Sequence, residues 1–150
     1  MAAVVTKQLL ASPTTLATTA LNSQANNALV ACTVFDNTIG QTGDGYEEAD
    51  FELYIASFGG TPTASTGFSL WLLVANDGTN YEDGSSSVTP ARAPDLVFPI
   101  RAVSTAQRIN KRVSLPSGKF TPLLKNDGTG QTTASSGNIL VIRPVTREAV

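Results

Sequence analysis

Short apolar runs with a two-residue period recur along this chain, and glycine, proline, asparagine or serine bounds each of them. In residues 50–57, for example, Phe51, Leu53 and Ile55 alternate with more polar neighbours. Alternation of this kind places the apolar side chains on one face of a strand, whereas a helix would repeat them every three or four residues. The chain is therefore expected to fold from strands.

Seven segments have this strand character. They are residues 28–35, 50–57, 68–75, 95–103, 108–115, 119–125 and 138–144. Seven or more short strands without a helical pattern predict a β-sandwich or a barrel. We expect an all-β, single-domain sandwich of the jelly-roll type, with an immunoglobulin-like sandwich as the alternative.

Two of these segments carry positional information. Residues 68–75 are apolar nearly throughout. Such a run predicts a central strand that is covered on both faces, by the core and by a partner. Pro99 removes a backbone donor from segment 95–103, so this strand is expected at a sheet edge or at a bulge.

The first 27 residues are rich in alanine and threonine and follow no clean period. We expect residues 1–27 to form an extended arm, with a short strand or a short helix in it, and residues 28–150 to form the sandwich. The residues expected at an interface with another subunit are Val4, Val5, Leu9, Leu10, Trp71 and Tyr81. Pro13 interrupts the apolar run that follows Lys7, which argues against a secretory signal, so synthesis in a cytoplasm is expected.

The chain has no histidine and one cysteine, Cys32. This composition excludes Ser-His-Asp and Cys-His catalysis and a tetrahedral zinc site within one chain, and Cys32 is expected to be a small buried hydrophobe. Charged residues make up 15% and the net charge is -2, so no strong field attracts nucleic acid or an anionic membrane. We expect a non-enzymatic protein without a cofactor, a metal, a nucleic-acid partner or a membrane partner. A carboxylate-pair glycosidase is the one enzyme class that remains open.

Two stretches are rich in possible oxygen ligands for calcium. Acidic residues occur at Asp36, Asp44, Glu47, Glu48, Asp50 and Glu52, and Asp and Asn residues are interspersed over 76–83. Neither stretch has the spacing of an EF-hand loop. A solvated acidic loop and a hairpin turn followed by a loop are therefore expected.

Aromatic residues offer a different kind of site. Trp71, Tyr46, Tyr54 and Tyr81 could form a platform on which a sugar stacks. Trp71, however, lies within an apolar strand, which favours a place in the core or at a subunit interface.

Three stretches give the chain a likeness to a known class of proteins. They are LLVANDGTNYEDG at 72–84, RVSLPSGKFTPLLKN at 112–126 and SSGNILVIRP at 135–144. These turn and strand signatures resemble small structural proteins of tailed bacteriophages, in the style of capsid decoration, or cement, proteins. The resemblance covers about the last two-thirds of the chain.

The resemblance implies a virion protein that binds the major capsid protein, often as a homotrimer, over junctions between capsid subunits. A protein that binds only the assembled shell stabilises that shell by mass action. Two alternatives remain open at this point: a tail or head–tail component of a phage, and a carbohydrate-binding β-sandwich module.

Overall fold

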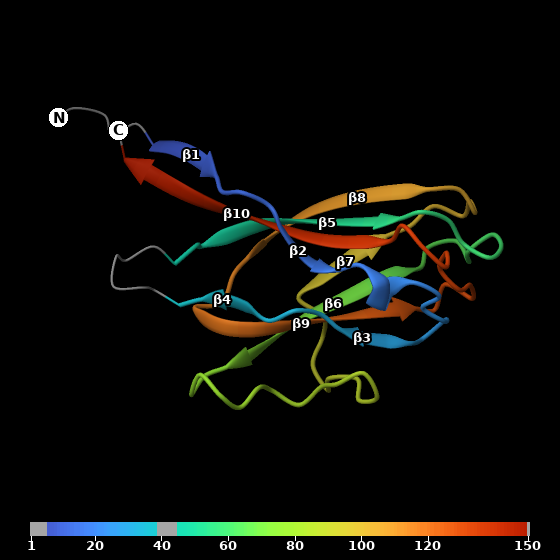
Figure 1. The fold of residues 1–150 in the computed structure, drawn as a ribbon, viewed down its shortest axis with the longest axis horizontal. Helices are drawn as coiled ribbons and strands as arrows, with labels where there is room; N and C mark the ends of the chain where they lie inside the picture. The colour runs from blue at the N-terminus through green and yellow to red at the C-terminus, as the bar shows by residue number, and fades with distance from the viewer. Residues whose placement is uncertain (1–5, 39–44, 150) are drawn as a thin grey trace.

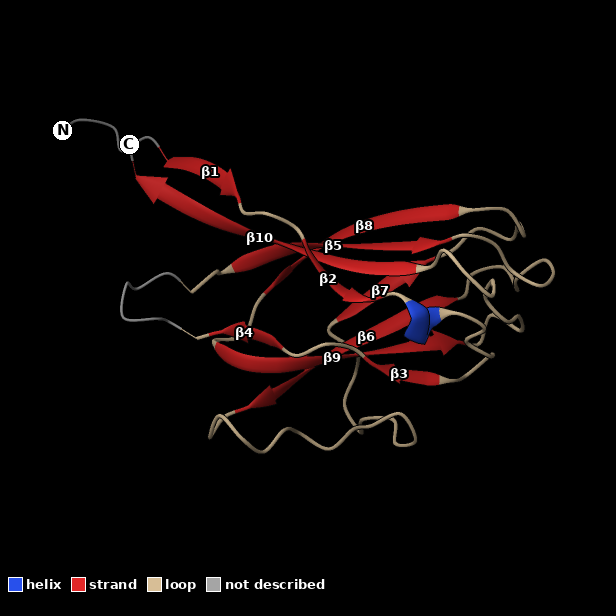
Figure 2. Cartoon of the chain, in the orientation of Figure 1, coloured by secondary structure: helices blue, strands red, loops and turns tan. Residues whose placement is uncertain are grey.

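The protein is an all-β sandwich in a computed structural model that describes residues 6–38 and 45–149, without the side chains of 6–7 and 147–149. Two antiparallel five-stranded sheets lie face to face (Figures 1 and 2). Sheet A contains β1 (Thr6–Leu10), β2 (Thr14–Ala17), β5 (Glu48–Ile55), β8 (Gln107–Ser114) and β10 (Ile139–Ala149). Sheet B contains β3 (Leu29–Ala31), β4 (Phe35–Asn37), β6 (Gly67–Ala75), β7 (Leu96–Pro99) and β9 (Gly118–Asp127). One 3-10 turn, η1 (Thr19–Leu21), follows β2.

Two prolines explain why ten strands are present where fewer were expected. Pro144 lies in β10 between the part that pairs with β2 and the part that pairs with β1. Pro122 lies in β9 between the parts that pair with β3 and β4. Because a proline cannot donate to a neighbouring strand, each outer strand breaks opposite it. The backbone N–H groups of Ala11 and Cys32 instead bond to the carbonyls of Pro144 (2.9 Å) and Pro122 (2.8 Å).

The strand order is that of a jelly roll. Strands β1 and β2 can be counted as one interrupted strand, and so can β3 and β4. The ten strands then become eight, numbered again in chain order. Sheet A then has the order 1-8-3-6 and sheet B the order 2-7-4-5. Two interleaved four-stranded sheets of this kind make a jelly roll, which confirms the first of the two predicted sandwich types.

The main core lies between the two sheets. Phe51, Phe68, Phe98 and Phe120 are fully buried there. Burial in β5 alternates at every second residue, as the sequence pattern predicts, since successive side chains of a strand point to opposite faces. Cys32 is buried in the same cluster, and this burial raises the pKa of its thiol to about 12.

Strand β6 is buried on both faces. Its inward side chains join the main core, and Trp71 and Leu73 form a second cluster with Leu123 on the outer face of sheet B. The cover on that outer face comes from residues 76–95, which we call the strap (Figure 1). The sequence predicted that a partner covers this face of the strand. Over this cluster, the chain itself supplies the cover.

Strand β7 is shorter than the predicted segment 95–103. It ends at Pro99, and it pairs with β6 alone, so it lies at the edge of sheet B as expected for a strand that contains proline. Ile100, immediately after it, donates its backbone N–H to the carbonyl of Thr66 (3.1 Å).

The segment predicted as an N-terminal arm is extended in its described part, but it lies on the sandwich. Strands β1 and β2 pair with β10, and Leu16 and Leu21 belong to the main core. Deletion of residues 1–27 would thus remove core side chains, so a test of this segment's binding role must leave β2 in place. The ribbon of β1 and the end of β10 projects beyond the body of the sandwich (Figure 1).

Candidate functional site

The outer face of sheet A is polar. Strand alternation brings Asp50, Glu52 and Tyr54 of β5 to this face, and the register of β8 places charged and amide side chains opposite them. Asp50 pairs with Arg112, Glu52 with Asn110, and Tyr54 with Arg108. The sequence alternation of β5 predicted this outward set, whereas its partners on β8 follow only from the topology.

Two ion pairs hold the β5 carboxylates in place. Arg112 binds Asp50 through two hydrogen bonds, from Nε to Oδ1 (2.7 Å) and from Nη2 to Oδ2 (2.8 Å). Arg108 binds Glu52 and lies over the ring of Tyr54, 4.5 Å from its centroid. These contacts fix both carboxylates on the sheet and occupy one face of the tyrosine ring.

A groove of about 630 Å³ crosses this face of the sheet. It is lined by Pro13, Thr15, Asp50, Glu52, Asn110, Val141 and Arg143. These residues come from all four strand positions of sheet A, from β2 and the turn before it to β8. Because most of the lining residues lie on adjacent strands, the geometry of the sheet sets the distances between their polar groups.

The carboxylate of Asp50 is stabilised in its charged form. Hydrogen bonds from Arg112 hold the pKa of Asp50 below its usual range, against the upward effect of partial burial, and the charge of Arg143 adds to the lowering. The same pairing raises the pKa of Arg112. The pKa of Asp50 is lower in the folded state than in the unfolded state. The small stabilisation from the Asp50–Arg112 pair is therefore fully present at pH values above the unfolded-state pKa, and it is lost as the pH falls through the folded-state pKa.

Two lining groups have hydrogen-bonding capacity to spare. The Asn110 side chain is exposed and makes no hydrogen bond within the described part of the chain. Arg143 donates through Nε to the carbonyl of Ala11 (3.1 Å), which leaves its two terminal nitrogens for a ligand. Neither residue stood out in the sequence, because a lone Asn or Arg in a strand carries no recognisable spacing.

None of the predicted interface residues that the structure describes lines this groove. Trp71 is 3% exposed beneath the strap and donates its indole N–H to the carbonyl of Arg92 (3.0 Å). Tyr81 lies on the strap and is 36% exposed, and Leu9 and Leu10 lie in β1. Val4 and Val5 fall outside the described residues. The four aromatic residues of the hypothetical sugar platform are not brought together, since Tyr54 and Trp71 occupy the outer faces of different sheets.

Acidic side chains of the two candidate calcium stretches lie in the part of the chain that the structure describes. No group of three acidic, histidine or cysteine side chains gathers there. Asp77 instead accepts hydrogen bonds from the backbone N–H groups of Asn80 (2.7 Å) and Thr79 (2.8 Å), and these bonds lower its pKa to about 2. This arrangement matches the expected turn. Asp44 lies outside the described residues.

No family model and no curated protein sequence matches this chain. Among solved structures it is similar to a CBM35 module of Cellvibrio japonicus Abf62, with a TM-score of 0.44 and 17% identity over 94% of this chain and 97% of that one. It is also similar to a family 35 carbohydrate binding module from an environmental isolate (TM-score 0.42, 14% identity, 85% and 75% covered). A third likeness is to the tripod of the bacteriophage Tuc2009 baseplate (TM-score 0.28, 8% identity, 97% and 46% covered). None of these likenesses is close enough to transfer a ligand or a role to this chain.

Within residues 6–38 and 45–149, no helix has the length and apolar character needed to cross a membrane.

Proposed function

We propose that this chain is a non-catalytic carbohydrate-binding module that holds a saccharide in the groove across sheet A. The observation that carries the proposal is the set of planar polar groups of Asp50, Asn110 and Arg143 around the apolar side chain of Val141. Carboxylate, amide and guanidinium groups present paired acceptors and donors, which suit the adjacent hydroxyls of a sugar ring. The groove volume of about 630 Å³ also falls within the range of small-ligand sites.

The rigidity of the groove supports the same proposal. Asp50 and Glu52 are already oriented by their arginine partners, so little side-chain entropy is lost when a ligand binds. The lining lies mainly on paired strands, which hold polar groups more accurately than loops do. A preformed polar surface of this kind is expected to bind with modest affinity, through hydrogen bonds more than through ring stacking.

A catalytic role fits the groove less well. A glycosidase needs one carboxyl whose pKa is raised so that it can act as a general acid. In this groove, Arg112 lowers the pKa of Asp50, and Glu52 is paired with Arg108. Binding without turnover is therefore the proposed activity.

Replacing Asn110 with alanine should weaken saccharide binding by about tenfold, the effect of losing one to two hydrogen bonds to the ligand. The measurement is titration calorimetry with the best ligand from an array of neutral, amino and acidic glycans. Asn76→Ala is the matched control, because Asn76 is also exposed and lies outside the groove. Equal affinity of the Asn110→Ala variant and the wild type would remove this groove as the site.

A second candidate function is that of a virion structural protein, either a capsid decoration protein or a phage tail component. The observation that favours it is the ribbon of β1 and the end of β10, which extends past the last residue pair between β10 and β5, Val145 with Glu48. Leu10 in this ribbon is 48% exposed. An isolated two-stranded ribbon is marginally stable in water, and its open edges are templates for pairing with another chain.

In this second candidate, the chain binds the major capsid protein on the surface of the virion as a homotrimer, after synthesis in the host cytoplasm. Size exclusion with light scattering should then give the mass of a trimer, and a variant that lacks residues 1–10 should give a monomer. A wild-type monomer would argue against this candidate. It would leave the carbohydrate-binding proposal intact, because in the part of the chain that the structure describes the groove is lined by residues from Pro13 onward.

A further inference from the structure

The edge of β6 is incomplete in sheet B. Strand β7 pairs with β6 only from Gly67 to Leu70, although β6 continues to Ala75. From Trp71 to Ala75 no strand of the described residues lies beside this edge. Sheet edges with unpaired backbone groups attract other strands, so proteins usually cover them.

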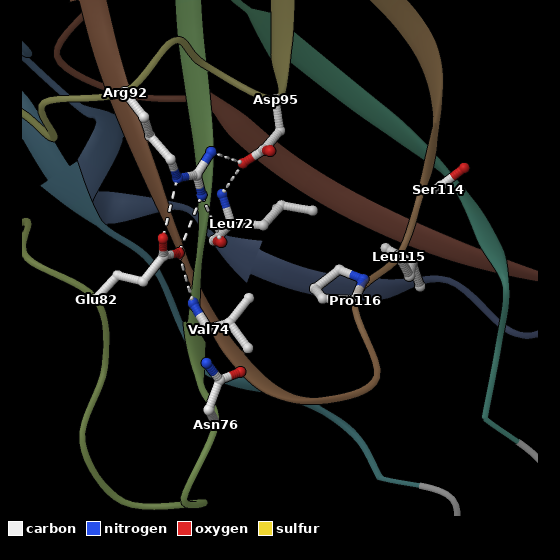
Figure 3. Close-up of a pocket in the computed structure, with 9 residues that line it drawn as sticks. All are labelled: Leu72, Val74, Asn76, Glu82, Arg92, Asp95, Ser114, Leu115 and Pro116. Atoms are coloured by element: carbon white, nitrogen blue, oxygen red, sulfur yellow. Dashed lines mark hydrogen bonds and ion pairs between the residues drawn. The ribbon is translucent and has the colours of Figure 1, made fainter.

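Side chains of the strap take the place of the missing strand (Figure 3). The backbone N–H of Leu72 donates to Oδ2 of Asp95 (2.7 Å), and Nη2 of Arg92 donates to the carbonyl of Leu72 (2.9 Å). The backbone N–H of Val74 donates to Oε2 of Glu82 (3.1 Å), and the backbone N–H of Glu82 donates to the carbonyl of Val74 (3.1 Å). Three of these four bonds thus depend on a charged side chain.

Arg92 joins the two carboxylates that cover the edge. Its Nε donates to Oε1 of Glu82 (3.1 Å), its Nη2 to Oε2 of the same residue (3.1 Å), and its Nη1 to Oδ2 of Asp95 (2.9 Å). The three side chains remain 31–39% exposed. Ion pairs with this exposure are screened by solvent and each contributes little stability.

The strap also covers an apolar cluster that is separate from the main core. The cluster consists of Trp71, Leu73 and Leu123, with Leu29 packed against it. The strap lies close to this cluster, because a Cβ added at Gly84 would come within 2.9 Å of Cδ1 of Leu73. On the other side of the three charged side chains, a cavity of about 470 Å³ extends to Leu115 and Pro116 of the β8–β9 turn (Figure 3).

We propose that the strap, residues 76–95, opens as a unit while the sandwich stays folded, with Arg92 as its latch. Opening exposes the β6 edge from Trp71 to Ala75 together with the cluster beneath it. Opening is local because the main core lies on the other face of sheet B and keeps its contacts. Segments held by few, partly exposed bonds open at lower free energy than the core does. The closed strap blocks strand addition at this edge.

Hydrogen exchange with mass spectrometry tests the latch. In an Arg92→Met variant, the amides of Leu72 and Val74 should exchange about tenfold faster than in the wild type, because the partly exposed hydrogen bonds of Arg92 together contribute about as much as one well-formed charge-assisted bond. The amides of Phe51 and Leu53 in β5 should keep their rates.

Two further variants make the test specific. Arg112→Met breaks a comparable pair on sheet A, with Asp50, and should leave the exchange of Leu72 and Val74 unchanged. Glu82→Gln removes one charge but keeps an acceptor for Val74, so it should give a smaller acceleration than Arg92→Met. Unchanged exchange at Leu72 and Val74 in both strap variants, or equal acceleration at Phe51 and Leu53, would overturn the proposal.

Discussion

Replacing Phe51 with alanine should lower the free energy of unfolding by about 3–5 kcal/mol, the loss expected for a large side chain removed from a closed core. Phe51 is fully buried in the middle of β5. It is paired with Ile142 of β10 on one side and with Lys111 of β8 on the other. Neighbouring strands on both sides restrict the backbone, so the cavity cannot collapse easily and the cost should lie in this upper range.

Urea unfolding monitored by far-ultraviolet circular dichroism measures this loss, because this signal reports the strands of the whole sandwich. Tyr81→Ala is a suitable control, because Tyr81 is 36% exposed on the strap and its removal should cost less than about 1 kcal/mol. The dependence of the free energy on urea concentration should be the same for both variants if the folded state is retained. A loss at Phe51 no larger than that at Tyr81 would mean that the Phe51 side chain does not lie in the core between the two sheets.

Asn138→Ala should cost about 2–3 kcal/mol, because it leaves a backbone donor without its partner. Asn138 is buried immediately before β10 and connects three parts of the chain, two of which are distant in sequence. Its Oδ1 accepts from the backbone N–H of Ala56 (3.0 Å), and its Nδ2 donates to the carbonyls of Ala134 (2.8 Å) and Leu21 (3.2 Å). One amide thus joins η1, the end of β5 and the turn before β10.

The matched control for this variant is Asn80→Ala. The Asn80 amide bonds only to exposed Asp77, so its removal should cost about 0.5 kcal/mol. Thermal or urea unfolding of both variants measures the difference. Equal losses of unfolding free energy at the two positions would indicate that the hydrogen bonds of Asn138 do not hold the N-terminal segment against the sandwich.

Much of the fold could be predicted from the period of the apolar residues. Segments 50–57, 68–75 and 108–115 correspond to β5, β6 and β8. Strands β5 and β6 show their alternation or continuous apolar run through buried residues, whereas β8 shows it through partly buried apolar residues that pack against the core. Segment 28–35 is two strands instead of one, because Pro122 in a distant strand interrupts its pairing. A contact between residues about ninety positions apart leaves no local signal.

The site was less accessible to sequence analysis for the same reason. The sequence indicates that Asp50 and Glu52 belong to an acidic stretch and to the polar face of a strand, but Asn110 and Arg143 carry no recognisable spacing. The groove forms because the jelly-roll order places β2, β10, β5 and β8 side by side, and this order depends on long-range pairing. Trp71, which was considered for a sugar platform, is covered because the strap folds back over its strand.

The most direct test of the proposed function is an amide NMR titration of the isotope-labelled protein with a panel of neutral, amino and acidic saccharides. We expect at least one saccharide to shift the amide signals of Asp50, Glu52, Asn110, Val141 and Arg143 in a saturable way, while signals from β6 and β9 stay in place. If no saccharide shifts these signals, or if the shifts cluster on the strap or on sheet B, the groove across sheet A is not a carbohydrate-binding site.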